Sequence, residues 1–440
     1  MRDSRPRKQR SQVEPRRLDT PCTLRAYSSL DEWEARAADL RRQILASAGL
    51  LPLPRRNPLR ARIFGRIEAS GHTVEKVHFE SRPGFLVTGN LYRPTSGDGP
   101  WPGVLSPHGH WEYGRLEATD LGDVPRRCID LARQGYVTFA YDMIGYNDSL
   151  QLPHGRVSGG GRAGVPPPEA ELADRLDQMW GISLMGLQLW NTIRAVDFLS
   201  SLPDVDSARI ACTGASGGAT QTFLATAVDE RITVSAPVCM ISAHYQGGCL
   251  CENSPALRLD TNNLEIGALA APRPLLLVST SGDWTKNGPE VEYPWIRDIY
   301  RLYGAEERVG SWHQDETHNY NLKSRRAVYQ WFSRWLGQSR NWERFRERGF
   351  GHDPRPGAPD LLVFYGRTPP KGLPTRAQLR RAMVRESTDQ LAARWPKTKA
   401  ALSRFRRHYG PLFHRALSAR IPAPEELVSC HRSLEPIGKR

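Results

Sequence analysis

Long apolar stretches are missing from this sequence of 440 residues. No run approaches the roughly 20 apolar residues that a membrane-spanning helix needs, so we expect no membrane segment and no membrane partner. The N-terminal sequence MRDSRPRKQRSQVEPRRLDT is basic but lacks the apolar central region of a secretory signal peptide. We therefore predict a cytoplasmic location, with export as the alternative if the natural start lies upstream.

Cysteine is scarce, and its positions form no regular pattern. The seven cysteines are Cys22, Cys128, Cys212, Cys239, Cys249, Cys251 and Cys430. An odd number in a chain of this length is typical of reduced thiols. Cys249 and Cys251, in GGCLCEN, form a single C-x-C pair, which is a weak metal motif without a second pair of ligands. We expect these two side chains to be buried or to line a pocket, and we predict neither a metal site nor a cofactor.

Acidic residues are fewer than basic ones, 47 against 61, and the net charge is +14. The positive excess lies at the two ends of the chain. Residues 1–17 hold seven Lys or Arg against two Asp or Glu, and residues 341–440 hold 21 against nine. The part between them is therefore close to neutral. Basic flanks can bind polyanions, but solvated charged segments are the commoner case, so we expect no nucleic-acid partner.

Strand-type and helix-type segments alternate through most of the chain. Short strand-type runs occur at residues 73–81, 85–94, 102–107, 136–142, 208–213, 232–238, 273–280 and 308–312. Helical patterns occur at residues 28–50, 123–135, 183–202, 219–228, 290–304 and 324–337, the first with Ser29 or Asp31 as its N-cap. This alternation predicts an α/β fold, with a mostly parallel central sheet and helices on both faces.

The composition divides the chain into three predicted parts. These are a basic disordered arm at residues 1–28, an α/β catalytic domain at residues 29–340, and a basic C-terminal extension or linker at residues 341–440. Within the domain, residues 143–180 are rich in Gly and Pro and too long for an ordinary connection, and such loops are usually functional or mobile. Asp142, immediately before this segment, follows a strand, and we expect it to hold a loop in place.

One serine lies among small residues, in the sequence ACTGASGGATQT at residues 211–222. The segment before it is of strand type, and the segment after it is of helix type. A strand that turns sharply into a helix at G-x-S-x-G is a nucleophile elbow, in which the glycines allow a tight turn that exposes the serine hydroxyl. Ser216 is therefore a candidate nucleophile. The alternative is an ordinary glycine-rich turn with a solvated serine.

A serine nucleophile needs a base to take its proton and an acid to orient that base. After an elbow of this kind the acid comes next and the histidine last, each beyond a later strand. Asp283 lies 67 residues after Ser216, and His318 lies 35 residues after Asp283, and each spacing fits one helix plus one strand. Singly, each residue has a simple structural explanation as a helix cap or a surface histidine. Their joint order favours a catalytic pair, with His313 and Asp315 as nearby rivals.

The reaction also needs hydrogen-bond donors for the oxygen that becomes negative. The backbone N–H of Gly217 comes with the elbow. A second donor is expected in the loop after an earlier strand, where SPHGHWEYGR contains an H-G-x pattern. We assign this donor to the backbone of His110, with Trp111 as the alternative. A metal site at His108 and His110 lacks a carboxylate or third histidine at useful spacing.

From Tyr27 to Leu336 the sequence resembles the α/β-hydrolase superfamily, and within it the bacterial acetyl-xylan-esterase-like and dienelactone-hydrolase-like proteins. Besides the elbow, the shared motifs are PHGHWEYGR, YDMIGYNDS, GGCLCEN, GDWTKN and THNYN. The resemblance implies an acyl-ester hydrolase that uses no cofactor. It also implies that Ser216 is the nucleophile, Asp283 the acid and His318 the base. Many members of this branch are exported.

These residues predict a serine esterase that cleaves small acyl esters through an acyl-enzyme, with acetylated carbohydrate as a candidate substrate. Trp111, Tyr113 and Trp284 are candidates for framing a pocket for a sugar ring or an arene, with core packing as the alternative. Two rival hypotheses are a serine peptidase of prolyl-oligopeptidase type and a hydrolase fold that serves as a binding module. The peptidase normally includes a β-propeller, and no blade repeat occurs in this sequence.

Overall fold

The computed structural model describes residues 20–154, 175–337, 347 and 358–416. By its internal contacts the chain divides into two compact units, Met1–Leu391 and Ala392–Arg440. In the second unit, Phe405 on helix α11 (Lys399–Ala416) packs against Trp395 and Tyr409, with ring centroids 5.9 and 4.6 Å away. The first unit contains the sheet and every predicted site residue.

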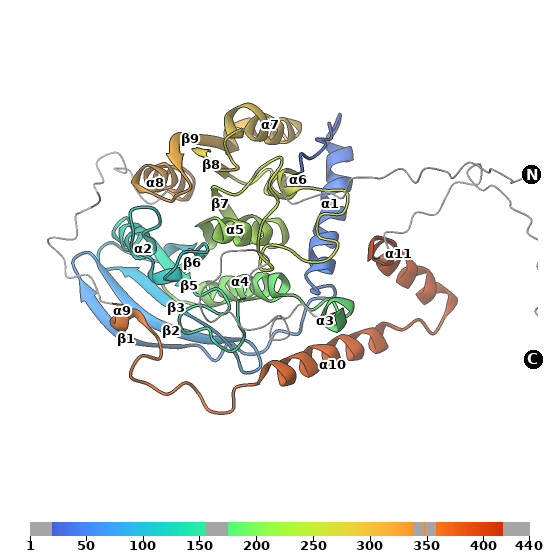
Figure 1. Cartoon of the computed structure of the whole chain (residues 1–440), viewed down its shortest axis with the longest axis horizontal. Helices are drawn as coiled ribbons and strands as arrows, with labels where there is room; N and C mark the ends of the chain where they lie inside the picture. The colour runs from blue at the N-terminus through green and yellow to red at the C-terminus, as the bar shows by residue number, and fades with distance from the viewer. Residues whose placement is uncertain (1–19, 155–174, 338–346, 348–357, 417–440) are drawn as a thin grey trace, which may run out of the picture. The chain divides into compact units, whose positions relative to one another are not determined.

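A nine-stranded sheet forms the centre of the first unit (Figure 1). The strand order is β1-β2-β3-β5-β4-β6-β7-β8-β9, antiparallel from β1 to β5 and parallel from β5 to β9. The strands are β1 (Arg62–Ala69), β2 (His72–Arg82), β3 (Phe85–Pro94), β4 (Trp101–Leu105), β5 (Val137–Tyr141), β6 (Val205–Ala215), β7 (Ile232–Val238), β8 (Leu275–Gly282) and β9 (Val309–Thr317). The predicted, mostly parallel sheet is confirmed. The sequence pattern misses β1 because none of its eight residues is fully buried.

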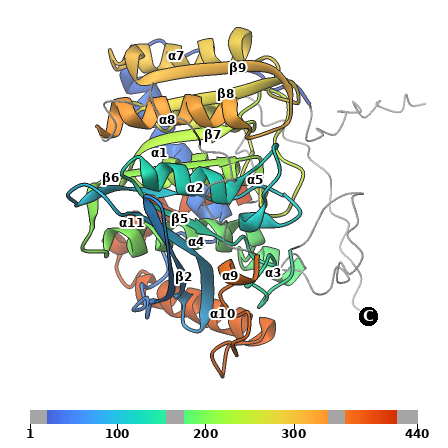
Figure 2. The same cartoon turned by 90° about the vertical axis from the view of Figure 1, so that its left-hand side faces the viewer.

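Helices cover both faces of this sheet (Figures 1 and 2). In β8, Leu275 and Leu277 belong to one apolar cluster, with side chains of α1, α4, α5, α6 and α7. Leu276 and Val278 belong to another, with side chains of α2 and α8. Successive strand residues point to opposite faces, so this alternation places the two sets of helices on opposite sides.

The helices of the first unit are α1 (Leu30–Ser47), α2 (Val124–Arg133), α3 (Arg175–Met179), α4 (Leu184–Ser200), α5 (Gly217–Val228), α6 (Asn263–Ala268), α7 (Tyr293–Leu302), α8 (Leu322–Leu336), α9 (Ala358–Leu361) and α10 (Arg376–Arg394), the last of which ends just past the unit boundary. Ser29, rather than Asp31, is the N-cap of α1, and its side chain accepts a hydrogen bond from the backbone N–H of Glu32. Within the described ranges, no helix is both long enough and apolar enough to cross a bilayer.

Part of the predicted C-terminal extension belongs to the first unit and packs within it. Leu361 and Val363 are buried, and Asp148 accepts hydrogen bonds from the backbone of Val363 and Phe364. The predicted boundaries at residues 28 and 340 stay predictions, because residues 1–19 and 338–346 lie outside the described residues. Most of the predicted Gly/Pro segment, residues 155–174, also lies outside the described residues.

Asp130 on α2 is a buried carboxylate with little compensation. Among the described residues neither of its oxygens has a hydrogen-bond partner, and the guanidinium groups of Arg126 and Arg133 lie 3.9 and 3.5 Å away. Burial, with a further contribution from the Glu347 carboxylate, raises the pKa of Asp130 to about 7. In the unfolded chain this proton dissociates near pH 4. The native carboxyl group therefore reduces the stability of the fold progressively as the pH rises from about 4 to 7.

We predict that Asp130→Asn stabilises the protein at pH 8 but has little effect at pH 4. The amide keeps the shape of the side chain and removes the charge that the fold must bury at high pH. The difference between a native pKa of about 7 and an unfolded pKa near 4 sets an upper limit of about 4 kcal/mol for the gain at pH 8, measured as a rise of several degrees in the unfolding temperature. Asp298→Asn, at an exposed carboxylate, is the control. An equal gain at both pH values would contradict the explanation.

Candidate active site

Ser216 lies at the turn between β6 and α5, with φ 57° and ψ −124°. This is a backbone region that a side chain rarely adopts, as expected at a nucleophile elbow. A Cβ atom at Gly214 or at Gly218 would lie 2.4 or 2.5 Å from the carbonyl oxygen of Pro107. Both positions need glycine because the loop after β4 passes directly over the elbow.

Asp283 and His318 follow two neighbouring parallel strands, β8 and β9, whose last residues Gly282 and Thr317 are paired. The Nδ1 atom of His318 lies 2.7 Å from Oδ2 of Asp283. Because an ionised carboxylate only accepts hydrogen bonds, Nδ1 donates and Nε2 keeps its lone pair. Within the described part of the chain, Nε2 is buried and has no hydrogen-bond partner. A nitrogen in this state is able to take a proton from a hydroxyl group.

The carboxylate of Asp283 is held in its charged form. Its Oδ1 atom accepts hydrogen bonds from the backbone N–H and the hydroxyl of Thr285, each at 2.6 Å. Burial raises the pKa of Asp283, but the hydrogen bonds from His318 and Thr285 outweigh burial, so the pKa lies below its ordinary value. A charged Asp283 fixes the orientation of the His318 ring through the hydrogen bond from Nδ1.

The rival residues face other partners. His313, on β9 itself, contacts the hydroxyl groups of Ser279 and Ser281 at 2.8 and 3.1 Å. Asp315 is exposed to solvent. Of the two histidines considered, His318 is therefore the one that the structure pairs with Asp283.

The loop after β4 lies against the elbow, as the predicted oxyanion donor requires. A Cβ atom at Gly217 would lie 2.7 Å from Cε1 of His110, so the imidazole of His110 lies directly over the first residue of α5. His108 fixes this loop: its Nε2 accepts a hydrogen bond from the backbone of Met143, and its Nδ1 contacts the carbonyl of Gly109. Burial lowers the pKa of His108 to about 3, so this ring stays neutral.

Two of the three predicted aromatic residues flank His318. The ring centroids of Trp284 and Trp111 lie 4.6 and 6.0 Å from that of His318. Tyr113 is 58% exposed, and its backbone contacts Glu117. Tyr245, which the sequence analysis misses, stacks on Trp284 with centroids 4.4 Å apart. Trp111 and Trp284 thus form an aromatic wall beside the proposed base.

Asp142 belongs to a buried ion-pair network rather than to the Ser216 site. Its two oxygens accept hydrogen bonds from Arg115 at 2.7 Å, and Arg115 also binds Asp148 at 2.7 Å. Asn147 and Thr88 donate two further hydrogen bonds to Asp142. This network ties the loop after β4 to the loop after β5, consistent with the predicted role of Asp142.

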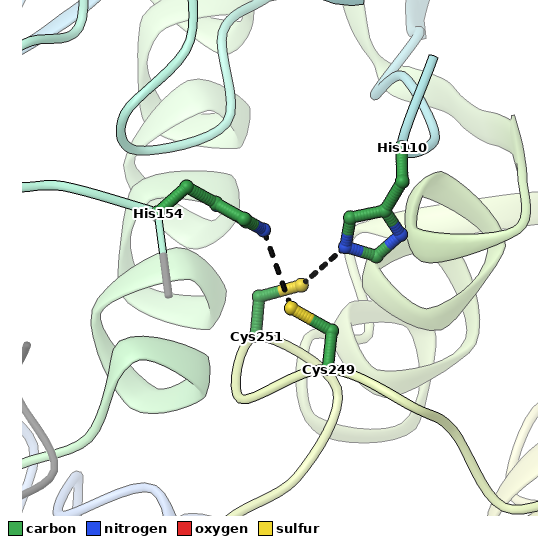
Figure 3. Close-up of side chains that lie close together, drawn as sticks. All are labelled: His110, His154, Cys249 and Cys251. Atoms are coloured by element: carbon green, nitrogen blue, oxygen red, sulfur yellow. Dashed lines mark hydrogen bonds between the residues drawn. The ribbon is translucent and has the colours of Figure 1, made fainter. Parts of the chain in front are cut away.

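A second cluster of reactive side chains adjoins the elbow. His110, His154, Cys249 and Cys251 converge, and their potential ligand atoms all lie within 4.8 Å of one another (Figure 3). No sequence motif indicates His154, which is separated from the cysteines by about 95 positions. Only the GGCLCEN motif pointed to this place. Both cysteines are buried, as expected.

Comparisons with known proteins concern the fold and the general class of activity. No family model matches the sequence. A protein of Bacillus subtilis (strain 168) named "Putative hydrolase YtaP" is 25% identical over 256 residues, which make up 54% of this chain and 79% of that protein. Among solved structures, Methylesterase BT1017 has a TM-score of 0.63 and 28% identity, covering 87% of this chain and 78% of that one.

A further solved structure, "a putative acetyl xylan esterase" from Bacteroides fragilis NCTC 9343, has a TM-score of 0.52 and 15% identity, covering 67% of this chain and 79% of that one. At this identity the likeness concerns the fold. The predicted resemblance is confirmed, and the similarity to a hydrolase and to esterases supports an ester hydrolase. This chain has the α/β-hydrolase fold and is similar in sequence to a putative hydrolase and in structure to a methylesterase.

Proposed function

We propose that the protein is a serine ester hydrolase in which Ser216, His318 and Asp283 are nucleophile, base and acid. The observation that supports this most strongly is the 2.7 Å contact between His318 and Asp283. This contact lies at the same edge of the sheet as the strained turn of Ser216. Strands β6, β8 and β9 are parallel, and each of the three residues follows the carboxyl end of one of them. A binding module has no need of this combination.

The proposed reaction has two acyl-transfer steps. Ser216 Oγ attacks the ester carbonyl while Nε2 of His318 takes its proton, and Asp283 stabilises the imidazolium. His318 then gives this proton to the departing alcohol oxygen, which leaves an acyl-enzyme. Water, deprotonated by His318, releases the acid and restores Ser216. The backbone N–H groups of Gly217 and His110 are the proposed donors to the negative oxygen.

We propose that the substrates are carbohydrate esters in which either the acyl group or the alcohol group is small. Trp111 and Trp284 offer flat apolar surfaces beside His318, and such surfaces suit the apolar face of a sugar ring. The names of two structural relatives point to two small groups. The methylesterase acts on methyl esters, and the putative acetyl xylan esterase is named for acetyl esters. Acetylated carbohydrate is the first candidate. Methyl-esterified carbohydrate is the second, because the methylesterase has the higher structural similarity and sequence identity of the two.

A fluorophosphonate probe tests the proposed nucleophile directly. The probe reacts with activated serine hydroxyl groups, so we expect one adduct per chain, mapped by mass spectrometry to the peptide that contains Ser216. Heat-denatured protein and the Ser216→Ala variant should stay unlabelled. An adduct at another serine, or an unchanged adduct in Ser216→Ala, would remove Ser216 from the mechanism.

The substrate class is tested in parallel with p-nitrophenyl acetate, acetylated xylan, methyl-esterified pectin and a prolyl p-nitroanilide. Release of acetate or methanol distinguishes the two ester candidates. Hydrolysis of the anilide without hydrolysis of any ester would favour the peptidase hypothesis.

A further inference from the structure

Four side chains from three separate loops meet beside the elbow (Figure 3). His110 comes from the loop after β4, His154 from the loop after β5, and Cys249 and Cys251 from the loop after β7. Nε2 of His110 lies 3.1 Å from Sγ of Cys251, and Nε2 of His154 lies 3.3 Å from Sγ of Cys249. Each histidine thus presents its Nε2 atom to one sulfur.

We propose that His110, His154, Cys249 and Cys251 form a tetrahedral zinc site. Two thiolates and two imidazoles are a common ligand set of structural zinc, and the two thiolate charges neutralise Zn²⁺. With Zn–S near 2.3 Å and Zn–N near 2.05 Å, tetrahedral geometry separates sulfur from nitrogen by about 3.5 Å. The observed 3.1 and 3.3 Å pairs, within a group that spans at most 4.8 Å, have nearly this size.

The surroundings of His154 prepare its ring to bind a metal. Its Nδ1 atom lies 2.7 Å from the carbonyl oxygen of Ile144. A carbonyl oxygen only accepts hydrogen bonds, so Nδ1 carries a proton, and Nε2 is the ring atom that faces Cys249. Metal-bound histidines usually donate their other N–H to a backbone carbonyl or a carboxylate in this way.

Glu252 shapes the cysteine turn and lies near His110. Its Oε1 atom lies 4.0 Å from Nδ1 of His110, on the side of the ring away from the sulfur. Its Oε2 atom accepts hydrogen bonds from the backbone of Gly248 and Cys249 at 2.8 and 3.0 Å. The buried carboxylate of Glu252 therefore shapes the C-x-C turn and also faces the ring of His110.

The site adjoins the catalytic centre without being part of the acyl transfer. His110 is the proposed second oxyanion donor through its backbone, and its ring lies over Gly217. All four ligands are protein side chains, and such closed sites are structural, whereas catalytic zinc sites keep an open position. Zinc would therefore act as a positioning element that joins three loops and fixes the backbone of His110 over the elbow.

Metal content tests the proposal independently of ester hydrolysis. The full chain is purified with a reducing agent, equilibrated with a slight excess of zinc sulfate, and desalted. We expect about one zinc ion per chain, measured by inductively coupled plasma mass spectrometry. Replacement by Co²⁺ should produce the visible bands of four-coordinate cobalt and a near-ultraviolet thiolate-to-cobalt band. Zinc removal by a chelator should lower the unfolding temperature, because an ion bound only by the native state stabilises it.

Matched cysteine variants locate the site. Cys249→Ser and Cys251→Ser should bring the zinc content to background and remove the thiolate-to-cobalt band. Cys22→Ser, at a half-buried thiol outside the cluster, should keep both. If the C-x-C variants fail to fold, His154→Ala serves instead. With its fold verified by circular dichroism, it should lose zinc to a competing chelator at a roughly tenfold lower chelator concentration or less.

Two results would overturn the proposal. The first is a zinc content in the unmodified chain that does not exceed that of Cys249→Ser. The second is a Cys249–Cys251 disulfide in the zinc-treated, reduced protein, detected as a loss of two hydrogens from the peptide mass. Ser216→Ala should bind zinc as the unmodified chain does, so this site and the proposed esterase activity stand or fall separately.

Discussion

Replacing Ser216 by alanine is expected to lower kcat for ester hydrolysis by about 10⁴- to 10⁶-fold while the unfolding temperature changes little. The large loss follows because no other group in the proposed mechanism forms the acyl bond. The small change in stability follows because the side chain of Ser216 caps no helix and alanine removes only its oxygen. Steady-state kinetics with p-nitrophenyl acetate and thermal unfolding measure the two effects.

The matched control is Ser279→Ala. Ser279 is a buried serine on β8 that contacts His313 rather than His318. Its replacement should change kcat by no more than a few-fold. A comparable loss in both variants would mean that the sheet edge as a whole, and not the hydroxyl of Ser216, supports the reaction.

The two histidines give a second matched pair for the same prediction. His318→Gln should lose nearly as much activity as Ser216→Ala, whereas His313→Gln should keep most of it. Residues that act as one unit show strongly non-additive effects, so the double variant Ser216→Ala/His318→Gln should lose no more than either single variant. Additive losses in the double variant would show that the two side chains act separately.

Most of the fold could be predicted because its pattern is repeated and local. The buried parallel strands are short apolar runs, and the helices that cover the sheet have clear ends, such as Ser29 before α1 and Gly337 after α8. β1 escapes prediction because its half-exposed residues show no clean alternation. Helix α6 also escapes prediction because six residues are too few for a helical period to emerge.

The site divides in the same way between local and distant features. Ser216, Asp283 and His318 each follow the end of a strand, so chain order alone predicts that they meet at one edge of the sheet. Tyr245 and His154 could not be found in this way, because their partners are set by how long loops fold back. Cys249 and Cys251 appear too few for a metal site until the structure brings two histidines to them.

The largest expected effect on stability concerns the buried network of Arg115. Its side chain is fully buried, and its five hydrogen bonds go to Asn90, Asp142, Asp148 and the carbonyl of Leu361. A guanidinium group away from water needs this compensation, because burial of an unpaired charge is very costly. The network joins β3, the loops after β4 and β5, and the segment that follows α9, so several distant parts depend on it.

Asp142→Ala should therefore destabilise the native protein by about 3–5 kcal/mol, since it leaves the guanidinium of Arg115 with one carboxylate instead of two. We expect the unfolding temperature to fall by roughly 5–10 °C. The control is Asp298→Ala, at the exposed pair with Arg301, where a loss of less than about 1 kcal/mol is expected. A similar loss in both variants would show that burial does not decide the cost.

The double variant Arg115→Met/Asp142→Ala separates the cost of an unpaired charge from the value of the pair. Methionine removes the guanidinium but keeps most of the apolar volume of the side chain, and Asp148 still accepts two backbone hydrogen bonds from Val363 and Phe364. If the unpaired charge is the main cost, the double variant should be at least as stable as Asp142→Ala alone. If it is clearly less stable, the remaining contacts of Arg115 make a net favourable contribution to the free energy of folding. The network then holds the loop of His110 in place through these contacts, and not only through the cost of leaving a buried charge unpaired.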